Sequence, residues 1–372
     1  MQQEHLNIPP NAVVAVALSG GVDSLMAAWE LLQAGHQVIG LHARFLAAEL
    51  DSGCQERLDG LEKACAFLNI PLKIADLREA FEALVIRPFI DAYAAGLTPN
   101  PCALCNPRLK FGLLLEYALS LGADLLATGH YARKGLWRPG PEKNRQEEDH
   151  GESQGYVTIY PARDQSKDQG YFLGLVPSAS LKRAIFPLAD QSKQMLRQKA
   201  AALGLPLPVP KESQEICFVP ADDYRAFLLG RKAALPGEGP VCLAGGREIA
   251  RHKGLWQYTE GQRRGLGIAW SEPLYVLAKN QAQNSLLVGP ACELKSDGCR
   301  ADRLNLYIPY SLWPEQVLVR VRYRQKALPA TVQIEGDTMH IRYNLPQVPA
   351  AKGQLAAVCH PEGFILGAGI IY

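Results

Sequence analysis

The sequence predicts an α/β N-terminal domain built on a parallel sheet, followed by a small central domain and an all-β, barrel-like C-terminal domain. Residues 13–130 alternate short apolar runs with amphipathic stretches, the pattern of a parallel sheet with helices on both faces. After about Leu235 the chain has only short alternating segments broken by Gly and Pro. A length of 372 residues suits two or three domains, and we place them at 1–221, 222–285 and 286–372.

Four apolar runs in the first domain are predicted to be buried strands, and four amphipathic stretches are predicted to be helices. The strands are expected at 13–18, 38–41, 72–74 and 125–127, and the helices at 24–33, 57–68, 80–95 and 109–121. Ligands of such sheets bind at the carboxyl ends of the strands, so a site is expected there.

Two further segments of this domain have their own composition. Residues 138–155 are rich in Pro, Gly and charge and are expected to form a flexible hairpin loop or insertion. Residues 177–203 have a helical pattern that ends at Gly204, with Pro206 just beyond. Helix is therefore predicted up to that stop signal.

Composition limits the classes of function. No apolar run approaches about 18 residues, which excludes a transmembrane helix, and the first residues do not resemble a signal peptide, so a cytoplasmic protein is expected. The formal net charge is only +2, so a nucleic-acid partner would need a local basic patch. Nine cysteines, an odd number in a large chain, do not predict a disulfide framework.

A candidate phosphate-binding loop follows the first strand. Residues 18–24, Leu-Ser-Gly-Gly-Val-Asp-Ser, lead directly into the first helix, so free N–H groups would converge on an anion. Ser19 and Ser24 add hydroxyl donors, and Asp23 is a candidate to hold Mg²⁺. The string is neither a Walker A loop nor a dinucleotide fingerprint. We favour phosphate binding over the alternative, a plain strand–helix turn.

A loop with two cysteines precedes the helix expected at 109–121. Residues 98–106, Thr-Pro-Asn-Pro-Cys-Ala-Leu-Cys-Asn, are braced by two prolines. Cys105 is expected near the start of that helix, where the helix dipole and the nearby charges of Arg108 and Lys110 would lower its thiol pKa. The sequence therefore predicts a nucleophilic thiolate at Cys105.

A third cysteine, Cys217, follows a Pro-rich linker that suits a mobile arm. The linker has prolines at positions 206, 208 and 210. The alternatives are coincidence or a structural metal, but a four-ligand zinc site would need another Cys or His pair at a similar spacing, which the sequence does not have. The remaining cysteines are expected to be core residues or incidental surface thiols: Cys54, Cys65, Cys242, Cys292, Cys299 and Cys359.

A basic stripe is expected in the C-terminal domain. Four basic residues occupy alternate positions within 317–326: Arg320, Arg322, Arg324 and Lys326. Side chains two apart on a strand share a face, so the four would contact successive phosphates of a nucleic acid. Two arginines at 263–264 add a second basic point. The alternative is a solvated β face, and the lack of interleaved acids favours RNA.

Taken together, these strings resemble the tRNA-specific 2-thiouridylases, PP-loop ATP pyrophosphatases that place sulfur on C2 of the wobble uridine of tRNA. The likeness covers nearly the whole chain and includes further strings: LKFG at 109–112, ATGHY at 127–131, KDQ at 167–169, SQEICFVP at 213–220, GQRRGLG at 261–267 and RYR at 322–324. It implies an adenine-nucleotide alpha-hydrolase-like PP-loop fold and ATP with Mg²⁺ as cofactors. It also implies tRNA with U34 and a persulfide sulfur-carrier protein as partners.

The resemblance implies roles for individual residues. ATP would bind to Ala17, Leu18, Ser19, Gly20, Gly21, Val22, Asp23 and Ser24, with Ala43 and Gly129 near the nucleotide. Cys105 matches the family nucleophile, and Cys217 matches the cysteine that receives a persulfide. The target base would lie against Asn100, Pro101 and Cys102, and tRNA would contact His130, Lys167, Asp168, Gln169, Arg322, Tyr323 and Gln354.

Two sulfur chemistries fit these residues. In the first, ATP adenylates the uridine oxygen, and attack of Cys105 on a Cys217 persulfide leaves a disulfide that external reductant opens. In the second, Cys102, Cys105 and Cys217 ligate a [4Fe–4S] cluster, an option strengthened because many relatives have Asp where this chain has Cys102. We favour the disulfide route. The alternatives to thiolation are a PP-loop enzyme that adenylates a small molecule and a nucleotide- or metal-binding RNA module without turnover.

Overall fold

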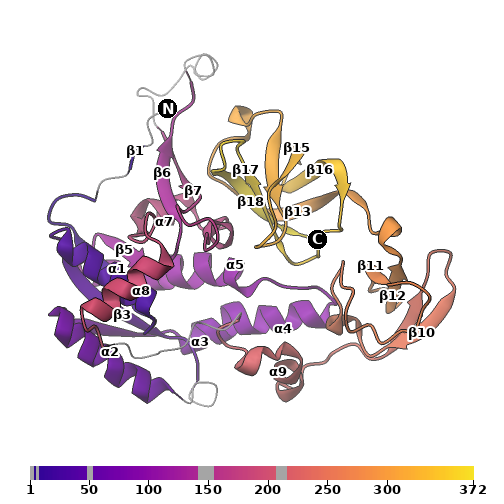
Figure 1. Cartoon of the computed structure of the whole chain (residues 1–372), viewed down its shortest axis with the longest axis horizontal. Coiled ribbons are helices and arrows are strands. Elements are labelled where there is room, and N and C mark those ends of the chain that lie inside the picture. Colours follow the sequence, from indigo (N-terminus) through magenta and orange to yellow (C-terminus); the bar gives the residue numbers. More distant parts are fainter. Residues whose placement is uncertain (1–3, 6–7, 48–52, 141–154, 207–215) are drawn as a thin grey trace.

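The computed structural model describes residues 4–5, 8–47, 53–140, 155–206 and 216–372. They form a parallel sheet with helices on both faces, a smaller mixed sheet and a closed antiparallel barrel (Figure 1). The predicted fold class is confirmed, whereas the domain limits drawn from the sequence stay predictions. In this part of the chain, no helix combines the length and apolarity that crossing a membrane requires.

The parallel sheet has the strand order β4-β3-β2-β5-β8. Its strands are β2 (Val13–Ala17), β3 (Gln37–Arg44), β4 (Leu72–Asp76), β5 (Leu125–Thr128) and β8 (Ala184–Ile185). The apolar runs form these strands because both faces of the sheet are covered. Ala17, the last residue of the central β2, pairs with Leu41 of β3 and with Thr128 of β5. The carboxyl ends of these three strands therefore lie side by side.

Helices cover the two faces of this sheet because side chains alternate along β2. The covering helices are α1 (Val22–Gln33), α2 (Cys54–Leu68), α6 (Leu114–Ser120), α7 (Ser178–Arg183) and α8 (Lys193–Ala202). Val14 and Val16 share one buried cluster with residues of α1, α2 and α8. Ala15 points to the opposite face and belongs to a cluster with residues of α6 and α7.

A helical excursion leaves the sheet after β4 and extends toward the central domain (Figure 1). It runs outward through α3 (Arg78–Phe81), the π-helical η2 (Glu82–Ile86) and α4 (Arg87–Ala94), and returns through α5 (Pro101–Cys105) and the π-helical η3 (Asn106–Leu113). Two residues explain the wide turn of η3. Pro107 has no N–H to donate, and Gly112 has φ −107° and ψ −106°. A Cβ on Gly112 would lie 2.9 Å from the carbonyl oxygen of Pro107, so only glycine fits there.

Two segments of this domain test the sequence predictions. β6 (Arg133–Trp137) and β7 (Tyr156–Tyr160) form an antiparallel hairpin with β1 (Glu4–His5) beside β6, but residues 141–154 of the predicted loop lie outside the described residues. The helix predicted over 177–203 is wrong in its middle, because β8 separates α7 from α8. The short strand is buried at the end of the sheet, where it pairs with β5.

The C-terminal half contains two β structures. The central sheet has the order β10-β9-β12-β11, formed by β9 (Gly239–Cys242), β10 (Glu248–His252), β11 (Tyr275–Asn280) and β12 (Ser285–Gly289). The barrel closes in the order β13-β16-β15-β14-β17-β18, formed by β13 (Ser296–Leu306), β14 (Val317–Arg320), β15 (Leu328–Glu335), β16 (Thr338–Gln347), β17 (Leu355–Cys359) and β18 (Ile365–Ile371). α9 (Tyr224–Gly230) precedes the central sheet.

The barrel is fixed to the N-terminal domain through a short buried turn that follows residue 169. The hydroxyl of Tyr171 donates to the carbonyl oxygen of Leu355 at 2.7 Å, and that of Tyr307 donates to the carbonyl oxygen of Leu173 at 2.7 Å. Both tyrosines are buried, so each hydroxyl needs such a partner. The barrel therefore sits above α5 (Figure 1).

Candidate active site

The predicted phosphate loop lies between β2 and α1 and is shaped by its own hydroxyl groups. Ser24 Oγ donates to the carbonyl oxygen of Gly21 at 2.9 Å and accepts from the backbone N–H of Ser19 at 3.2 Å. Gly20 has φ +86°, the left-handed region that glycine adopts without strain. No side chain caps the start of α1, so its first N–H groups are free to bind an anion.

Asp23 in the first turn of α1 has two partners that sequence reasoning missed. The hydroxyl of Tyr131 donates to Asp23 Oδ1 at 2.8 Å, and Lys193 Nζ lies 3.3 Å from Asp23 Oδ2. Lys193 is the first residue of α8 and brings a cation to the edge of the loop. The ATGHY string contained Tyr131 without indicating its role, and a lysine at a helix start gives no distinctive signal.

The other residues that the resemblance assigns to ATP lie at the same edge of the sheet. Ala43 is near the carboxyl end of β3, two residues beyond the partner of Ala17. Gly129 follows β5 directly, and a Cβ on it would lie 2.9 Å from the backbone nitrogen of Ser24. The backbone at Gly129 thus packs against the first turn of α1. The structure brings the whole predicted nucleotide set together.

The two cysteines of the CxxC string lie on α5, which begins eight residues before the helix predicted at 109–121. Asn100 caps this helix, and its Oδ1 accepts from the backbone N–H of Ala103 at 3.2 Å. Pro101 occupies the first position, where its missing N–H is not needed. Cys102 is therefore in the first turn, whereas Cys105 is the last residue of α5.

Cys105 does not have the low pKa that the sequence predicted. Its thiol is buried, and burial raises the pKa to about 12, while the positive charge of Lys110 acts in the opposite direction. Burial likewise raises the pKa of Cys102, against the same charge. The prediction counted the helix dipole and nearby charges but could not include burial in the aromatic cluster around α4.

Cys217 is exposed but is held by a buried neighbour. The ring of Phe218 lies 5.1 Å from that of Phe89 and 5.6 Å from that of Phe81, in the cluster that also contains Cys105. Although the residue as a whole is exposed, protein atoms crowd around its thiol and desolvate the thiolate form, which raises the pKa of Cys217 to about 11. The predicted mobile arm before it, including residues 207–215, lies outside the described residues.

The three cysteines share one neighbourhood. Cys102 and Cys217 each act to raise the pKa of Cys105, as like charges do when they are close. All nine cysteines of the chain are free thiols in this structure. Among the described residues, no group of three or more His, Cys, Asp or Glu side chains is arranged to hold a metal ion. The geometry therefore does not support the [4Fe–4S] alternative.

His130, expected to contact tRNA, is buried beside the cysteine helix. Its Nε2 lies 3.5 Å from Lys110 Nζ, and its Nδ1 lies 2.7 Å from Thr128 Oγ1. The ring packs between those of Phe111 and Phe186, with centroids 6.1 and 6.2 Å away. Burial and the charge of Lys110 hold the pKa of His130 well below its usual value. These contacts make His130 part of the core in this structure.

The segment at 167–169 is divided between surface and core. Lys167 is exposed. Asp168 is buried, where its Oδ1 accepts from the backbone N–H of Ala162 at 3.0 Å and its Oδ2 lies 3.1 Å from Arg320 Nη1. Gln169 Oε1 accepts from the backbone N–H of Tyr131 at 3.0 Å. Asp168 and Gln169 therefore stabilise the backbone at Ala162 and Tyr131.

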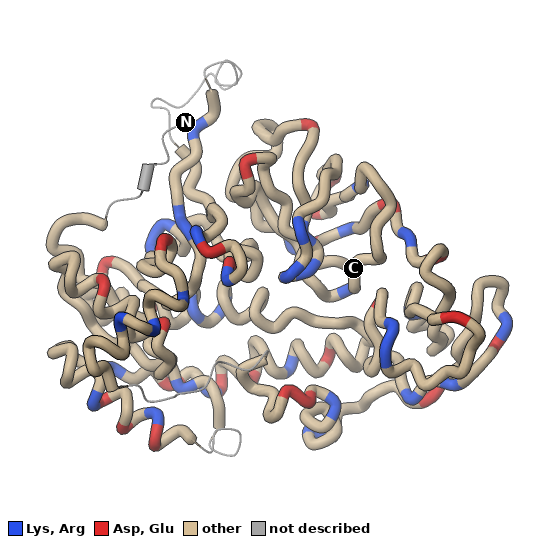
Figure 2. The backbone as a smooth tube through the Cα atoms, in the orientation of Figure 1, with Lys and Arg blue, Asp and Glu red and all other residues tan. Residues whose placement is uncertain are grey.

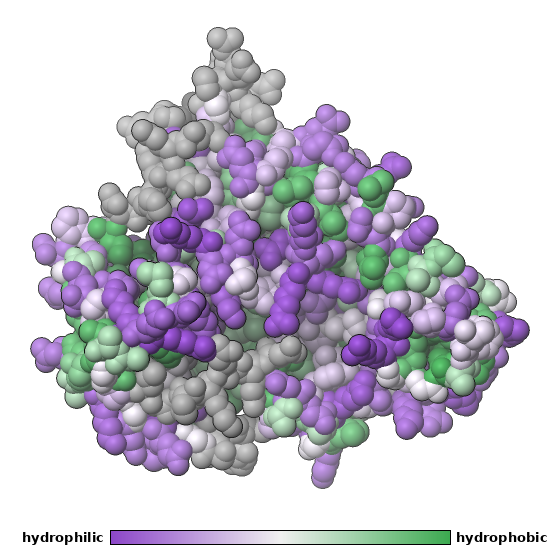
Figure 3. Space-filling model, in the orientation of Figure 1, coloured by the Kyte–Doolittle hydropathy of each residue, from purple (hydrophilic) through white to green (hydrophobic). Residues whose placement is uncertain are grey.

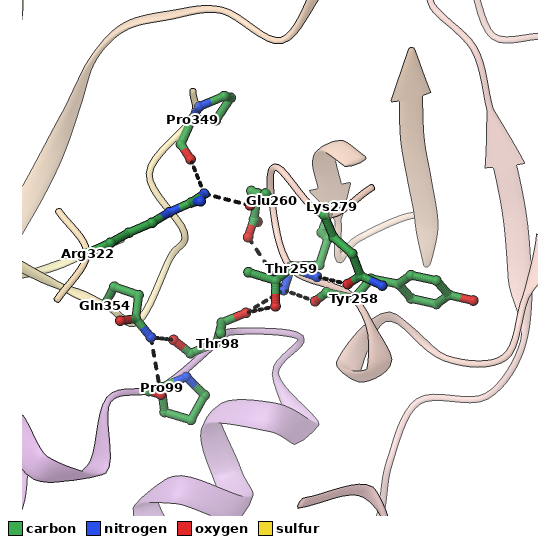
Figure 4. A network of polar contacts seen from close by, with 10 residues as sticks. Thr98, Pro99, Tyr258, Thr259, Glu260, Lys279, Arg322, Pro349 and Gln354 are labelled. Atoms are coloured by element: carbon green, nitrogen blue, oxygen red, sulfur yellow. Dashed lines mark hydrogen bonds and ion pairs between the residues drawn. The ribbon is translucent and has the colours of Figure 1, made fainter. Parts of the chain in front are cut away.

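The loop before α5 is tied to the barrel (Figure 4). Gln354 Nε2 donates to the carbonyl oxygens of Thr98 and Pro99 at 2.8 and 3.3 Å. The backbone N–H of Thr98 donates to the carbonyl oxygen of Lys352 at 2.8 Å. Gln354, which the resemblance placed at tRNA, thus holds the backbone two residues before Asn100.

The same loop is tied to the central domain. Thr98 Oγ1 lies 3.1 Å from Thr259 Oγ1 and 3.3 Å from Lys279 Nζ (Figure 4). Lys279 Nζ also lies 3.7 Å from Glu260 Oε2, and the two side chains are only 1% and 6% exposed. Arg322 joins the central domain to the barrel by donating to the carbonyl oxygen of Glu260 at 2.9 Å. Thr98 is therefore the meeting point of all three domains.

The predicted basic stripe is not formed. β14 ends at Arg320, and residues 321–325 turn instead of continuing the strand. Arg320 pairs with buried Asp168, and Arg322 donates a hydrogen bond to the carbonyl oxygen of Glu260 at the domain junction. The ring of Tyr323 packs 4.4 Å from that of Phe172. Only Arg324 and Lys326 of the predicted stripe are exposed.

Exposed cations nevertheless lie near the junction of the domains. Figure 2 shows Lys and Arg along the edge of the barrel that faces the N-terminal domain, and Figure 3 shows hydrophilic side chains gathered in the middle of this face. The exposed basic residues of the three domains include Arg163, Lys167, Arg263, Arg264, Arg324 and Lys326. They come from all three domains, so they offer a discontinuous rather than a linear basic surface.

Known protein families match the chain over most of its length. Residues 12–221 match the family model described as tRNA methyl transferase HUP domain, 227–290 the tRNA methyl transferase PRC-barrel domain, and 296–371 the Aminomethyltransferase beta-barrel domain. Proteins named tRNA-specific 2-thiouridylase MnmA from Nitratidesulfovibrio vulgaris (strain DSM 19637 / Miyazaki F) and Lawsonia intracellularis (strain PHE/MN1-00) are 48% and 45% identical to it. Each alignment covers 96% of this chain and 98% of the relative.

The chain is also similar, over part of its length, to one solved structure. It is described as a 4-thiouridine synthetase–RNA complex with bound ATP, and it has a TM-score of 0.34 and 15% identity, over 60% of this chain and 50% of that one.

Proposed function

The chain belongs to the tRNA-specific 2-thiouridylase family, and we propose on that premise that it uses ATP to place sulfur on C2 of the wobble uridine, U34, of tRNA. One observation carries the proposal beyond family membership. Residues 128–131 contact both halves of the site: Gly129 and Tyr131 touch the first turn of α1, and His130 reaches Lys110 beside the cysteines. Activation and sulfur transfer act on the same carbon, so they require such neighbouring sites.

The nucleotide half of the site supplies the activation step. The uridine C2 oxygen attacks the α-phosphorus of ATP, pyrophosphate leaves, and the oxygen becomes part of an AMP leaving group. The uncapped N–H groups of α1 and the hydroxyl of Ser19 bind the phosphates. Asp23, whose Oδ2 lies 3.3 Å from Lys193 Nζ, would hold Mg²⁺, which would neutralise phosphate charge when bound. Lys193 would balance charge at the same edge.

The cysteine half supplies sulfur. Cys217 is exposed, so a persulfide sulfur-carrier protein can reach it to form the Cys217 persulfide. The Cys105 thiolate attacks Sγ of Cys217, which forms the Cys105–Cys217 disulfide and releases hydrosulfide. Hydrosulfide adds to C2 and AMP leaves, with loss of a proton to solvent. An external dithiol supplies two electrons that reduce the disulfide.

Substrate RNA binds across the three domains in this proposal. The exposed cations at positions 167, 263, 264, 324 and 326 contact phosphates, and binding should therefore weaken steeply with salt. U34 turns out of the anticodon stack so that its C2 atom can enter the active site. Asn100, Pro101 and Cys102 lie at the start of α5, where they would face the inserted base.

Nucleoside mass spectrometry tests the proposal. Unmodified tRNA is incubated with the protein, ATP, Mg²⁺ and a persulfide source. We expect ATP-dependent 2-thiouridine that is lost in Cys105→Ser and Cys217→Ser but kept in Cys292→Ser, since Cys292 is a matched exposed thiol.

Two results would contradict the assignment. Absence of 2-thiouridine, both aerobically and after anaerobic cluster reconstitution, would oppose tRNA thiolation and favour a PP-loop enzyme with another substrate. Thiolation that survives Cys217→Ser would refute the persulfide role while leaving the substrate assignment intact.

A further inference from the structure

We infer that Lys110, held in place by the buried pair His130 and Thr128, is the cation that stabilises the thiolate forms of the sulfur-transfer cysteines. The inference deepens the proposed function and rests on it. It also gives His130 a different role from the tRNA contact that the resemblance implied: His130 acts through Lys110 as a positioning residue.

The π-helical geometry of η3 places Lys110 on the side of Cys105. In a regular α-helix, positions five apart are separated by about 140° around the axis. A π-helical turn takes about 4.4 residues, so positions five apart lie within about 50° of each other. η3 begins directly after Cys105 and continues through Lys110. Pro107 and Gly112, which cause the wide turn, therefore bring this lysine to the face of the thiol.

The buried histidine fixes where the ammonium group points. An ammonium group has only donors, so Lys110 Nζ must donate to His130 Nε2, 3.5 Å away. The other ring nitrogen, Nδ1, then carries the proton and donates to Thr128 Oγ1 at 2.7 Å. His130 is only 9% exposed and packed between two aromatic rings, so the ring cannot rotate freely. The neutral imidazole therefore presents Nε2 as a hydrogen-bond acceptor to Lys110.

The charge of Lys110 acts on all three cysteines. It opposes the effect of burial by lowering the pKa of Cys102, Cys105 and Cys217. The same charge also lowers the pKa of His130. Arg108, the other cation of η3, is exposed and donates to the carbonyl oxygen of Leu84 at 3.2 Å. Each thiol that ionises releases its proton to solvent, and the ammonium group stabilises the sulfur anion that remains.

The test follows alkylation of Cys217 by iodoacetamide at pH 8.5 in the full chain, read by peptide mass spectrometry. Lys110→Met is compared with Lys110→Arg and with Arg108→Met, which removes a charge from the same helical segment. We expect Lys110→Met to slow alkylation about three- to tenfold, because a smaller fraction of Cys217 is thiolate once the positive charge is removed. Lys110→Arg, Arg108→Met and the internal control thiol Cys292 should stay near wild-type rates.

Two outcomes would overturn the inference. The first is an unchanged Cys217 rate in Lys110→Met at an unchanged unfolding temperature. The second is equal slowing in Arg108→Met, which would show that general charge, not the placement of Lys110, controls the thiol. Because this readout uses neither tRNA nor ATP, its failure is distinguishable from a failure of the thiolation assay.

Discussion

Replacing Gly129 by Ala should disturb the phosphate loop more than the same change at Gly21 within the loop. A Cβ at position 129 would lie 2.9 Å from the backbone nitrogen of Ser24, and 3.0 and 3.2 Å from the carbonyl carbon and oxygen of Asp23. These are backbone atoms, so no change of rotamer relieves the overlap. At Gly21 the nearest atom is Ser19 Oγ at 3.6 Å, an ordinary contact.

The expected magnitude follows from this steric difference. Neither glycine has a positive φ, so the alanine side chain adds no backbone strain at either site. Overpacking against atoms that cannot yield costs about 1–3 kcal/mol, which we expect for Gly129→Ala. Gly21→Ala should change the free energy of unfolding by less than about 1 kcal/mol, because the restriction of the unfolded chain by alanine is offset by its poorer fit at the N-cap of α1.

Thermal unfolding without nucleotide separates the two variants, since bound phosphate cannot then interfere at Gly21. We expect a lower unfolding temperature for Gly129→Ala alone. Calorimetric titration with ATP should also show weaker binding, because the displaced N–H groups of α1 no longer converge on the phosphates. Wild-type stability together with wild-type ATP affinity in Gly129→Ala would refute the reasoning.

Three further predictions follow from the described contacts. Glu260→Gln and Lys279→Met should each lower the free energy of unfolding by about 3–5 kcal/mol in denaturant titrations, because each leaves a buried charge without its ion-pair partner. The double variant should lose less than the sum, and strict additivity would argue against the pair. Phe218→Ala should cost about 3–5 kcal/mol and slow oxidation to the Cys105–Cys217 disulfide, whereas an unchanged disulfide rate would show that Phe218 does not position Cys217. Since a thiol ionises as pH rises and the pKa of Cys217 is about 11, its alkylation rate should still climb above pH 9, where a free cysteine derivative with a pKa of about 8.5 levels off. A plateau at the pH of the free thiol would contradict that shift.

The nucleotide half of the site was predictable because the sequence patterns that indicate it are local. Strand 13–18 and helix 24–33 were expected from apolar pattern alone, and the structure has β2 and α1 at those places. A loop between a buried parallel strand and a helix must lie at the carboxyl edge of the sheet. Gly129 reaches the same edge because the strand before it is parallel to β2.

The errors arise where distant contacts override local pattern. Alternating Arg and Lys after Val317 are typical of a strand face, but Arg320 turns inward to buried Asp168, about 150 positions earlier, and the chain bends. The prediction of a low thiol pKa for Cys105 was wrong for a related reason. Helix α5 starts at Pro101, and aromatic residues from α4 and from the segment after Cys217 bury the thiol. Spacing along the chain contains no information on such burial.

The attachment of Thr98 to Gln354 also sets an order of events during protein synthesis. The two residues are 256 positions apart, and Gln354 is itself held by Ile371, whose backbone N–H donates to it at 2.8 Å. At a ribosomal rate of about 5–20 residues per second, the loop before the cysteine helix waits about 13–50 s for the residue that anchors it. A nascent chain can therefore complete its nucleotide loop early but not its cysteine loop. The contacts that fix this loop are thus complete only after the barrel strand Ile365–Ile371 has emerged and closed.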